Sequence, residues 1–219
     1  MSLYREIKSH QKGPEKSGYL MYYVYRKISV FFSIFFIKLR ISPNTITFLS
    51  LVSDGIVVYL MYLQKWIIAG LLVNLALILD CSDGEVARYY RSKEKNPTEK
   101  KYGSYLDEVL GTIGFTAVVF FAGYFMGKIW LGLFAMFGLF MVILTSLTAQ
   151  IEFPQKKEIA KKFEEGLFGN RKGRIGFTCA AQRILVSLGV IFSSIHLLFL
   201  FGVLCHTFYL FKFWIYRKL

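Results

Sequence analysis

The sequence predicts an all-α integral membrane protein with six transmembrane helices, preceded by an amphipathic helix at the membrane interface. Three observations support this fold class. The chain of 219 residues is 55% hydrophobic and 18% aromatic, a composition typical of membrane proteins. Its apolar residues are grouped in segments close to the roughly 20 residues that cross a hydrocarbon core. Its 27 Lys and Arg residues lie mostly between these segments, with a strong bias to one side.

The first part of the chain differs from the rest because its apolar residues are interrupted by charges. We expect residues 1–16 to form a polar tail and residues 17–41 to form the interfacial helix. Only ten uncharged residues separate Lys27 from Lys38, too few to cross a bilayer. Pro43 then marks the start of a new helix. Residues 42–219 are expected to form one membrane domain.

The membrane domain contains the six expected spans, which are residues 44–63, 66–81, 104–126, 129–150, 176–194 and 197–216. If the N-terminus is cytoplasmic, Lys65 and Lys128 are the only basic residues on the opposite side. The positive-inside rule therefore predicts that both termini are cytoplasmic. The net charge of +13 is then expected to serve contacts with anionic membrane lipids rather than with nucleic acid.

Acidic residues gather at the cytoplasmic ends expected for the second and third spans. They belong to a longer pattern of acidic, small and basic residues, which comprises Asp80, Asp83, Gly84, Ala87, Arg88, Gly103 and Asp107. The spacing of three puts Asp80 and Asp83 on one face of a helix. Carboxylates are costly in a bilayer and therefore indicate a functional site. Carboxylates from two neighbouring helices can converge on hard divalent cations.

The pattern resembles the motif of the CDP-alcohol phosphotransferase family, D-x2-D-G-x2-A-R followed by G-x3-D-x3-D. The first half is complete here. The second half has Gly103 and Asp107, but Gly111 stands where the family has a fourth aspartate. The loop after Arg88 is also longer than is usual in the family. The resemblance covers residues 80–111. It implies transfer of a substituted phosphoryl group from a CDP-linked alcohol to an acceptor hydroxyl, with release of CMP, by a membrane protein that is commonly a homodimer.

The resemblance also implies a role for each motif residue. Asp80, Asp83 and Asp107 would hold paired Mg²⁺ or Mn²⁺ ions against the pyrophosphate of the donor. Gly84 and Ala87 would leave space for the nucleotide beside the helix backbone.

Other residues around the motif would complete the nucleotide site. Arg88 would contact phosphate or the motif's own carboxylates, and Gly103 belongs to the same conserved pattern of the family. Asn44 and Thr47, which follow Pro43, match an Asn-x2-Thr segment that borders the nucleotide in the family.

Gly111 departs from the family at a position that is both a metal ligand and the proposed general base. Two acids are alternative catalytic residues. Glu108 lies about 100° around the helix from Asp107, whereas position 111 is on the face of Asp107. Asp54, an acid within the first span, is therefore the better substitute, although pairing with a neighbour such as Asn74 would explain it equally well. Otherwise water or a phosphate on the acceptor takes the proton, or the chain is a degenerate nucleotide- or lipid-binding protein without catalysis.

Basic residues before and within the fifth span suggest where the acceptor binds. Family members that use a phosphorylated polyol hold its phosphate near here, so the resemblance implies that Arg171, Arg174 and Arg183 contact the acceptor. Anionic lipid headgroups would select the same cations. A small transporter is a third class of function, but an acidic motif at one membrane surface and the lack of an inverted repeat argue against it.

Overall fold

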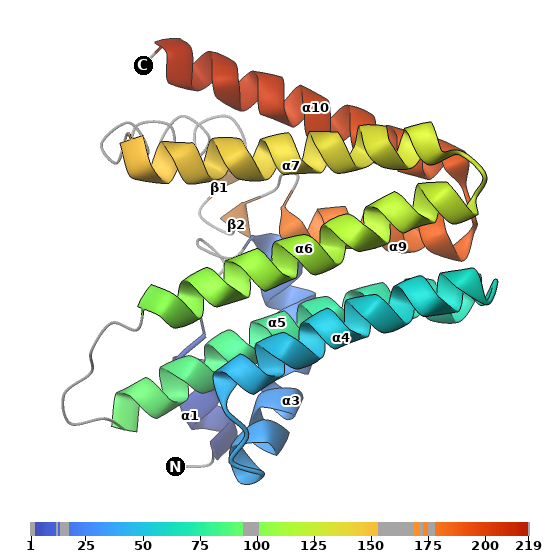
Figure 1. Cartoon of the computed structure of the whole chain (residues 1–219). Helices are drawn as coiled ribbons and strands as arrows, with labels where there is room; N and C mark the ends of the chain where they lie inside the picture. The colour runs from blue at the N-terminus through green and yellow to red at the C-terminus, as the bar shows by residue number, and fades with distance from the viewer. Residues whose placement is uncertain are drawn as a thin grey trace.

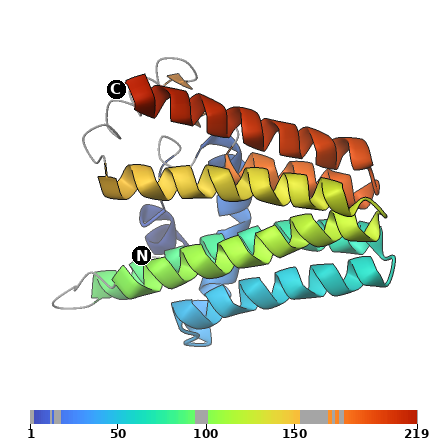
Figure 2. The ribbon, with the colours of Figure 1, turned by 45° about the horizontal axis from the view of Figure 1, so that its top comes forward.

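The structure is a computed structural model that describes residues 3–11, 13, 18–93, 101–152, 169–170, 173–174 and 178–218. The predicted all-α class is confirmed for this part of the chain. It is helical apart from short turns and one antiparallel pair of two-residue strands, β1 (Gly169–Asn170) and β2 (Gly173–Arg174). The longer helices run alongside one another, and the N-terminal helices pack at one end of this bundle (Figures 1 and 2).

The helices follow the expected order along the chain. They are α1 (Leu3–Ser9), the π-helix η1 (Met21–Tyr25), α3 (Arg26–Lys38), α4 (Pro43–Tyr62), α5 (Trp66–Lys93), α6 (Lys101–Phe125), α7 (Ile129–Glu152), α9 (Cys179–Ile191) and α10 (Ile195–Lys218). Ser42 caps α4 by accepting a hydrogen bond from the backbone N–H of Thr45, with Pro43 in the first turn. This start is the one that Pro43 predicts.

Apolar helices of membrane-spanning length agree with the prediction of a membrane protein. Helices α4 and α5 and the segment Asp107–Phe125 of α6 are long and apolar enough to cross a bilayer. The segments Ile129–Leu144, Cys179–Ile191 and Ile195–Phe211 are apolar but shorter within the described residues. The number of crossings therefore stays a prediction.

Helix α5 extends well beyond the expected end of the second span at residue 81, and it carries the whole D-x2-D-G-x2-A-R motif. The extension is stable as a helix because one side of it is packed: Ser82, Asp83, Glu85 and Val86 are all buried. A span predicted from hydropathy ends at the first polar residues. The helix itself continues to Lys93 because packing against neighbouring helices stabilises it.

Tight turns and small residues bring neighbouring helices together in the core. The turn after α3, the turn after α4 and the turn after α9 each contain a residue with positive φ: Arg40, Gln64 and Ser193. A Cβ at Gly70 would lie 2.8 Å from the backbone oxygen of Ser187, so α5 and α9 approach closely at this glycine. The main apolar core then fills the space among α4, α5, α6, α7, α9 and α10.

The N-terminal residues form more structure than the expected polar tail and interfacial helix. Residues 3–9 form α1, where Ile7 is fully buried and Glu6 pairs with Lys93 of α5 at 2.5 Å. Helix α3 has Phe31 and Phe35 among its exposed apolar residues, and its place at the membrane interface stays a prediction. Its opposite face carries small polar side chains and packs on α5, which hydropathy alone did not indicate.

Candidate active site

Helices α5 and α6 bring the three motif aspartates together. One carboxylate oxygen from each of Asp80, Asp83 and Asp107 lies within 4.8 Å of the other two. Asp80 and Asp83 lie one turn apart on α5, and Asp107 lies in the second turn of α6. Thr47 of α4 donates a hydrogen bond of 2.7 Å to Asp83 Oδ2. Three helices thus fix the orientation of this cluster, which we call the aspartate cluster.

The donor set of the aspartate cluster fits a divalent cation. Carboxylates this close repel one another unless a cation or a proton compensates their charge. Asp107 Oδ1 is buried and accepts no hydrogen bond from the described residues, as expected for an oxygen that is available to a metal. Oxygen ligands alone suit Mg²⁺ and Mn²⁺. The hydrogen bond from Thr47 is the kind of outer contact that orients a metal-binding carboxylate.

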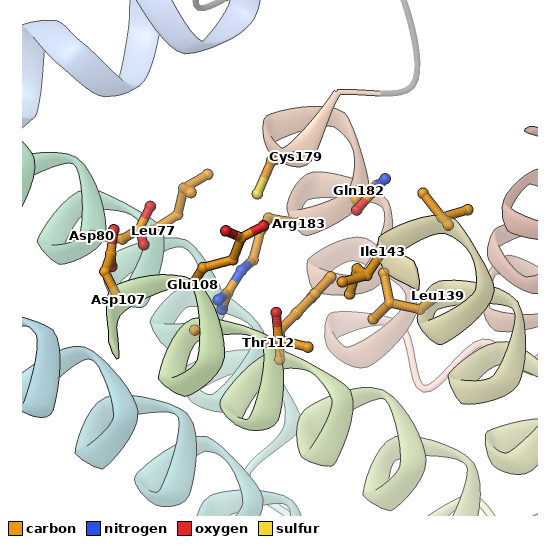
Figure 3. A pocket seen from close by; sticks show the side chains of 13 residues that line it. Leu77, Asp80, Asp107, Glu108, Thr112, Leu139, Ile143, Cys179, Gln182 and Arg183 are labelled. Carbon is orange, nitrogen blue, oxygen red and sulfur yellow. The ribbon is translucent and has the colours of Figure 1, made fainter. Parts of the chain in front are cut away.

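A cavity of about 410 Å³ adjoins the cluster between α5, α6, α7 and α9. Figure 3 shows its side chains. The lining is mixed, with the polar residues Asp80, Asp107, Glu108, Thr112, Cys179, Gln182 and Arg183 and the apolar residues Leu77, Phe115, Leu139, Val142 and Ile143. One wall therefore offers charged and hydrogen-bonding groups beside the cluster, while the wall from α7 is apolar.

Gly111 lies at the boundary between the aspartate cluster and this cavity. A Cβ at position 111 would lie 3.7 Å from Asp80 Oδ1 and would meet no other described atom within 4 Å. The family's fourth aspartate would thus point toward the cluster with room to spare. Glu108 also lines the cavity, and in Figure 3 it projects from α6 near Asp107.

Asp54 forms an ion pair with Arg183, the acid and base being 129 residues apart in sequence. Arg183 donates to Oδ1 at 2.8 Å and to Oδ2 at 3.4 Å, and its guanidinium lies 4.3 Å from the centre of the Phe115 ring. A Cβ at Gly114 would lie 2.5 Å from Asp54 Oδ2, so the glycine makes room for the pair. Asn74, the partner suggested from sequence, instead contacts Tyr25 and Ser187.

The other residues of the expected nucleotide site are spread around the motif. Arg88 donates from Nε to the backbone oxygen of His10 at 2.7 Å, and its Nη1 lies 3.2 Å from the Cβ position of Gly84. Ala87 is partly buried one turn beyond Asp83, and Asn44 is exposed at the start of α4. Gly103 lies in the first turn of α6.

Two of the residues expected to contact the acceptor lie in or next to the short strand pair in the sequence. Arg174 belongs to β2, and Arg171 lies outside the described residues. Arg183 alone of the three basic candidates can be assigned to a wall of the cavity within the described part of the chain.

Glu85 is a fully buried motif residue that the sequence analysis did not single out. It accepts hydrogen bonds of 2.7 Å from Gln11, Ser29 and Ser33, and Arg26 lies 3.7 Å away. The pair Ser29 and Ser33 was a usable signal, because two small polar residues four apart on an otherwise apolar helix indicate a face that packs on another polar group.

Apolar helices, a cluster of carboxylates suited to divalent ions and an adjoining cavity of mixed lining are features expected of membrane enzymes that transfer phosphoryl groups with the help of metals. The family model for CDP-alcohol phosphatidyltransferases matches residues 40–214. The chain therefore belongs to this family. A search of curated proteins found no match. Membership supports a phosphotransferase role in phospholipid synthesis, with a CDP-alcohol donor, an alcohol acceptor and divalent metals.

Proposed function

We propose that this protein transfers a substituted phosphoryl group from a CDP-linked alcohol to an acceptor hydroxyl at the aspartate cluster. The oxygen of the acceptor forms a bond to the β-phosphorus, the bond from that phosphorus to the phosphate of CMP breaks, and CMP leaves. The observation that supports this proposal best is the convergence of Asp80, Asp83 and Asp107 beside a cavity large enough for an acceptor.

The cluster would hold Mg²⁺ or Mn²⁺, two ions in the family's pattern. Bound there, the ions supply positive charge that offsets the pyrophosphate and the leaving oxygen. Asp80, Asp83 and Asp107 are the proposed ligands. Thr47 keeps Asp83 in place through its hydrogen bond. Gly84 and Ala87 have small or no side chains, so the nucleotide can approach the backbone of α5 there.

Glu108 is the acid best situated to accept the proton of the acceptor. It lines the cavity together with Asp107 and Gly111, so an acceptor bound there lies within its reach. Asp54 is committed to Arg183 and is not among the residues that line the cavity. The sequence favoured Asp54 over Glu108 as the substitute for the missing acid, whereas we propose Glu108. Asp54 acts by holding Arg183, and Arg183 contacts the acceptor or its headgroup.

The acceptor side and the membrane arrangement complete the proposal. Arg171 and Arg174 are proposed to assist Arg183 when the acceptor is a phosphorylated polyol. We also propose six membrane crossings, with α3 at the interface and its exposed Phe31 and Phe35 in the lipid. Both termini and the aspartate cluster would face the cytoplasm, where cytidine nucleotides are made, and the protein would form a homodimer.

A catalytically degenerate protein of the same fold that binds nucleotides or lipids is the second candidate function. Gly111 favours it, because the family's fourth carboxylate is missing from the cluster.

The release of CMP by the purified protein separates these two functions. We expect CMP in the presence of Mn²⁺ or Mg²⁺ when a panel of CDP-linked alcohols is combined with alcohol and polyol phosphate acceptors. Asp107→Asn is the matched control and should release none. If donors bind but no acceptor gives CMP, the degenerate function replaces the transferase.

A further inference from the structure

A buried arginine and a partly buried one lie next to or within the motif, and the buried one comes from outside the segment that the family model matches. Arg26 begins α3, whereas the match covers residues 40–214. Arg26 is only 7% exposed. Its Nε and Nη1 are buried and donate no hydrogen bond to any described residue. Buried guanidinium donors without partners are costly, so these atoms indicate a ligand that supplies acceptors.

Arg88 presents a second donor of the same kind. Its Nε is occupied by the backbone oxygen of His10, but its buried Nη2 has no partner in the described part of the chain. Its guanidinium lies against Gly84 of the motif, 3.2 Å from the position of a Cβ. Arg26 and Arg88 are hydrogen-bonded to adjacent residues of the N-terminal segment, because Gln11 donates to the backbone oxygen of Arg26 and the backbone oxygen of His10 accepts from Arg88.

The residues around Arg26 form a preorganised frame. Gln11 donates to the backbone oxygen of Arg26 at 2.8 Å and to Glu85 Oε1 at 2.7 Å. Ser29 and Ser33 donate to the two oxygens of Glu85. Glu85 is thereby held in place 3.7 Å from Arg26 Nη1.

The group formed by Glu85, Arg26 and Arg88 therefore carries a surplus of one positive charge. The surplus agrees with the charge of the donor. Two divalent ions would exceed the charge of the three aspartates by one, and the arginine group would add one more. The pyrophosphate of a CDP-linked alcohol carries two negative charges, and guanidinium forks match phosphate oxygens well.

We propose that Arg26 joins the motif residue Arg88 in binding the pyrophosphate group of the donor, with Glu85 and Gln11 holding Arg26 in position and the backbone oxygen of His10 holding Arg88. This inference rests on the proposed function. It makes the N-terminal helices part of the donor site, so that Arg26 contributes a charge which the family match does not contain.

Titration with CDP and Mg²⁺ in neutral detergent micelles, followed by calorimetry, tests the proposal. Arg26→Gln should weaken CDP binding about tenfold or more, because charge-assisted hydrogen bonds are lost. Lys27→Gln is the matched control: it removes the same charge from an exposed neighbour on the same helix and should leave CDP affinity unchanged. A folded Arg26→Gln variant with wild-type CDP affinity would overturn the proposal.

Two further measurements distinguish a folding defect and lipid binding from a loss of CDP binding. If Arg26→Gln does not fold, Arg26→Lys retains a charge for Glu85 but lacks the fork. It should still weaken CDP binding several-fold, and wild-type affinity would overturn the proposal. Binding to vesicles containing phosphatidylglycerol is measured in parallel. If Arg26→Gln lowers lipid binding and leaves CDP binding intact, the arginines serve an anionic headgroup and the proposal is wrong.

Comparison of CDP binding with CMP release separates this inference from the proposed transfer reaction. If CDP binding depends on Arg26 while the wild type releases no CMP with any acceptor, the anion site stands and the transferase function fails.

Discussion

Arg183 and Asp54 form a buried ion pair that joins α9 to α4, with Nη1 and Oδ1 2.8 Å apart. Arg183 lines the cavity whereas Asp54 does not, and the pair depends on Gly114 for space. The acid within the first span therefore has a structural partner, and that partner is a residue expected at the acceptor site.

Removing one partner of this ion pair should destabilise the protein. Asp54→Asn leaves the buried Arg183 without its counter-charge, and such losses cost about 3–5 kcal/mol. We expect a clearly lower Tm in detergent, measured by thermal unfolding of the purified protein.

Replacing both partners at once distinguishes stability from function. Asp54→Leu combined with Arg183→Met removes both charges and should recover much of the lost Tm. If the pair serves the acceptor site, this double variant should still bind CDP but show a raised KM for the acceptor. A weakened affinity for CDP with an unchanged acceptor KM would contradict the assignment of Arg183.

Asp107→Asn should remove metal-dependent activity without harming the fold. Asp107 Oδ1 makes no hydrogen bond within the described residues, and the aspartate cluster is repulsive when no cation is bound. In EDTA we therefore expect a Tm equal to that of the wild type or higher. Added Mn²⁺ should raise the Tm of the wild type by mass action and have little effect on the variant. Retained CMP release by the variant would show that the cluster is not the active site.

Local patterns in the sequence were sufficient to identify the aspartate cluster. Asp80 and Asp83 are one helical turn apart, and Asp107 follows in the next apolar segment. Two consecutive helices joined by one loop are therefore enough to bring the three carboxylates together. Thr47 was found through the family resemblance, because Asn44 and Thr47 after Pro43 match a segment that borders the nucleotide in the family. The convergence of the aspartates needs only spacing along helices, whereas the role of Thr47 needs the resemblance.

The contacts that the sequence did not reveal are those between distant segments. Asp54 finds Arg183 across 129 residues, and nothing local to either residue specifies the other. Glu85 and Arg26 were not singled out from the sequence, because hydropathy ranks residues by type. The hydrogen bonds from Ser29 and Ser33 that make burial of Glu85 tolerable depend on how α3 packs on α5.

Glu108→Gln should slow the reaction while leaving the donor bound normally. If Glu108 accepts the proton of the acceptor, loss of its carboxylate should lower kcat by about 10²–10⁴. Calorimetry with CDP and Mg²⁺ should give wild-type affinity, because Glu108 is not a proposed metal ligand. Glu6→Gln, which removes an acid from the exposed pair with Lys93, is the control and should keep its kcat. A wild-type rate in Glu108→Gln would remove Glu108 from the mechanism.

Gly111→Asp should restore a fourth carboxylate to the aspartate cluster. The Cβ position lies 3.7 Å from Asp80 Oδ1 with no other described atom within 4 Å, so the side chain fits and its oxygens lie beside the same ions. We expect Mn²⁺ to bind about tenfold more tightly, because ligand charge and number set the affinity of such sites. Without metal the added negative charge should lower the Tm, and Mn²⁺ should raise it by more than in the wild type.

Gly111→Asn separates the effect of charge from that of size. It has nearly the same volume but lacks the negative charge, so it should neither tighten Mn²⁺ binding nor lower the Tm in EDTA as the aspartate does. If both variants lose CMP release equally, the space at Gly111 is occupied by the acceptor, and the cavity beside Asp80 is used by substrate. If Gly111→Asp leaves Mn²⁺ affinity unchanged, position 111 does not reach the metal site, and the absence of the fourth aspartate is unrelated to metal binding.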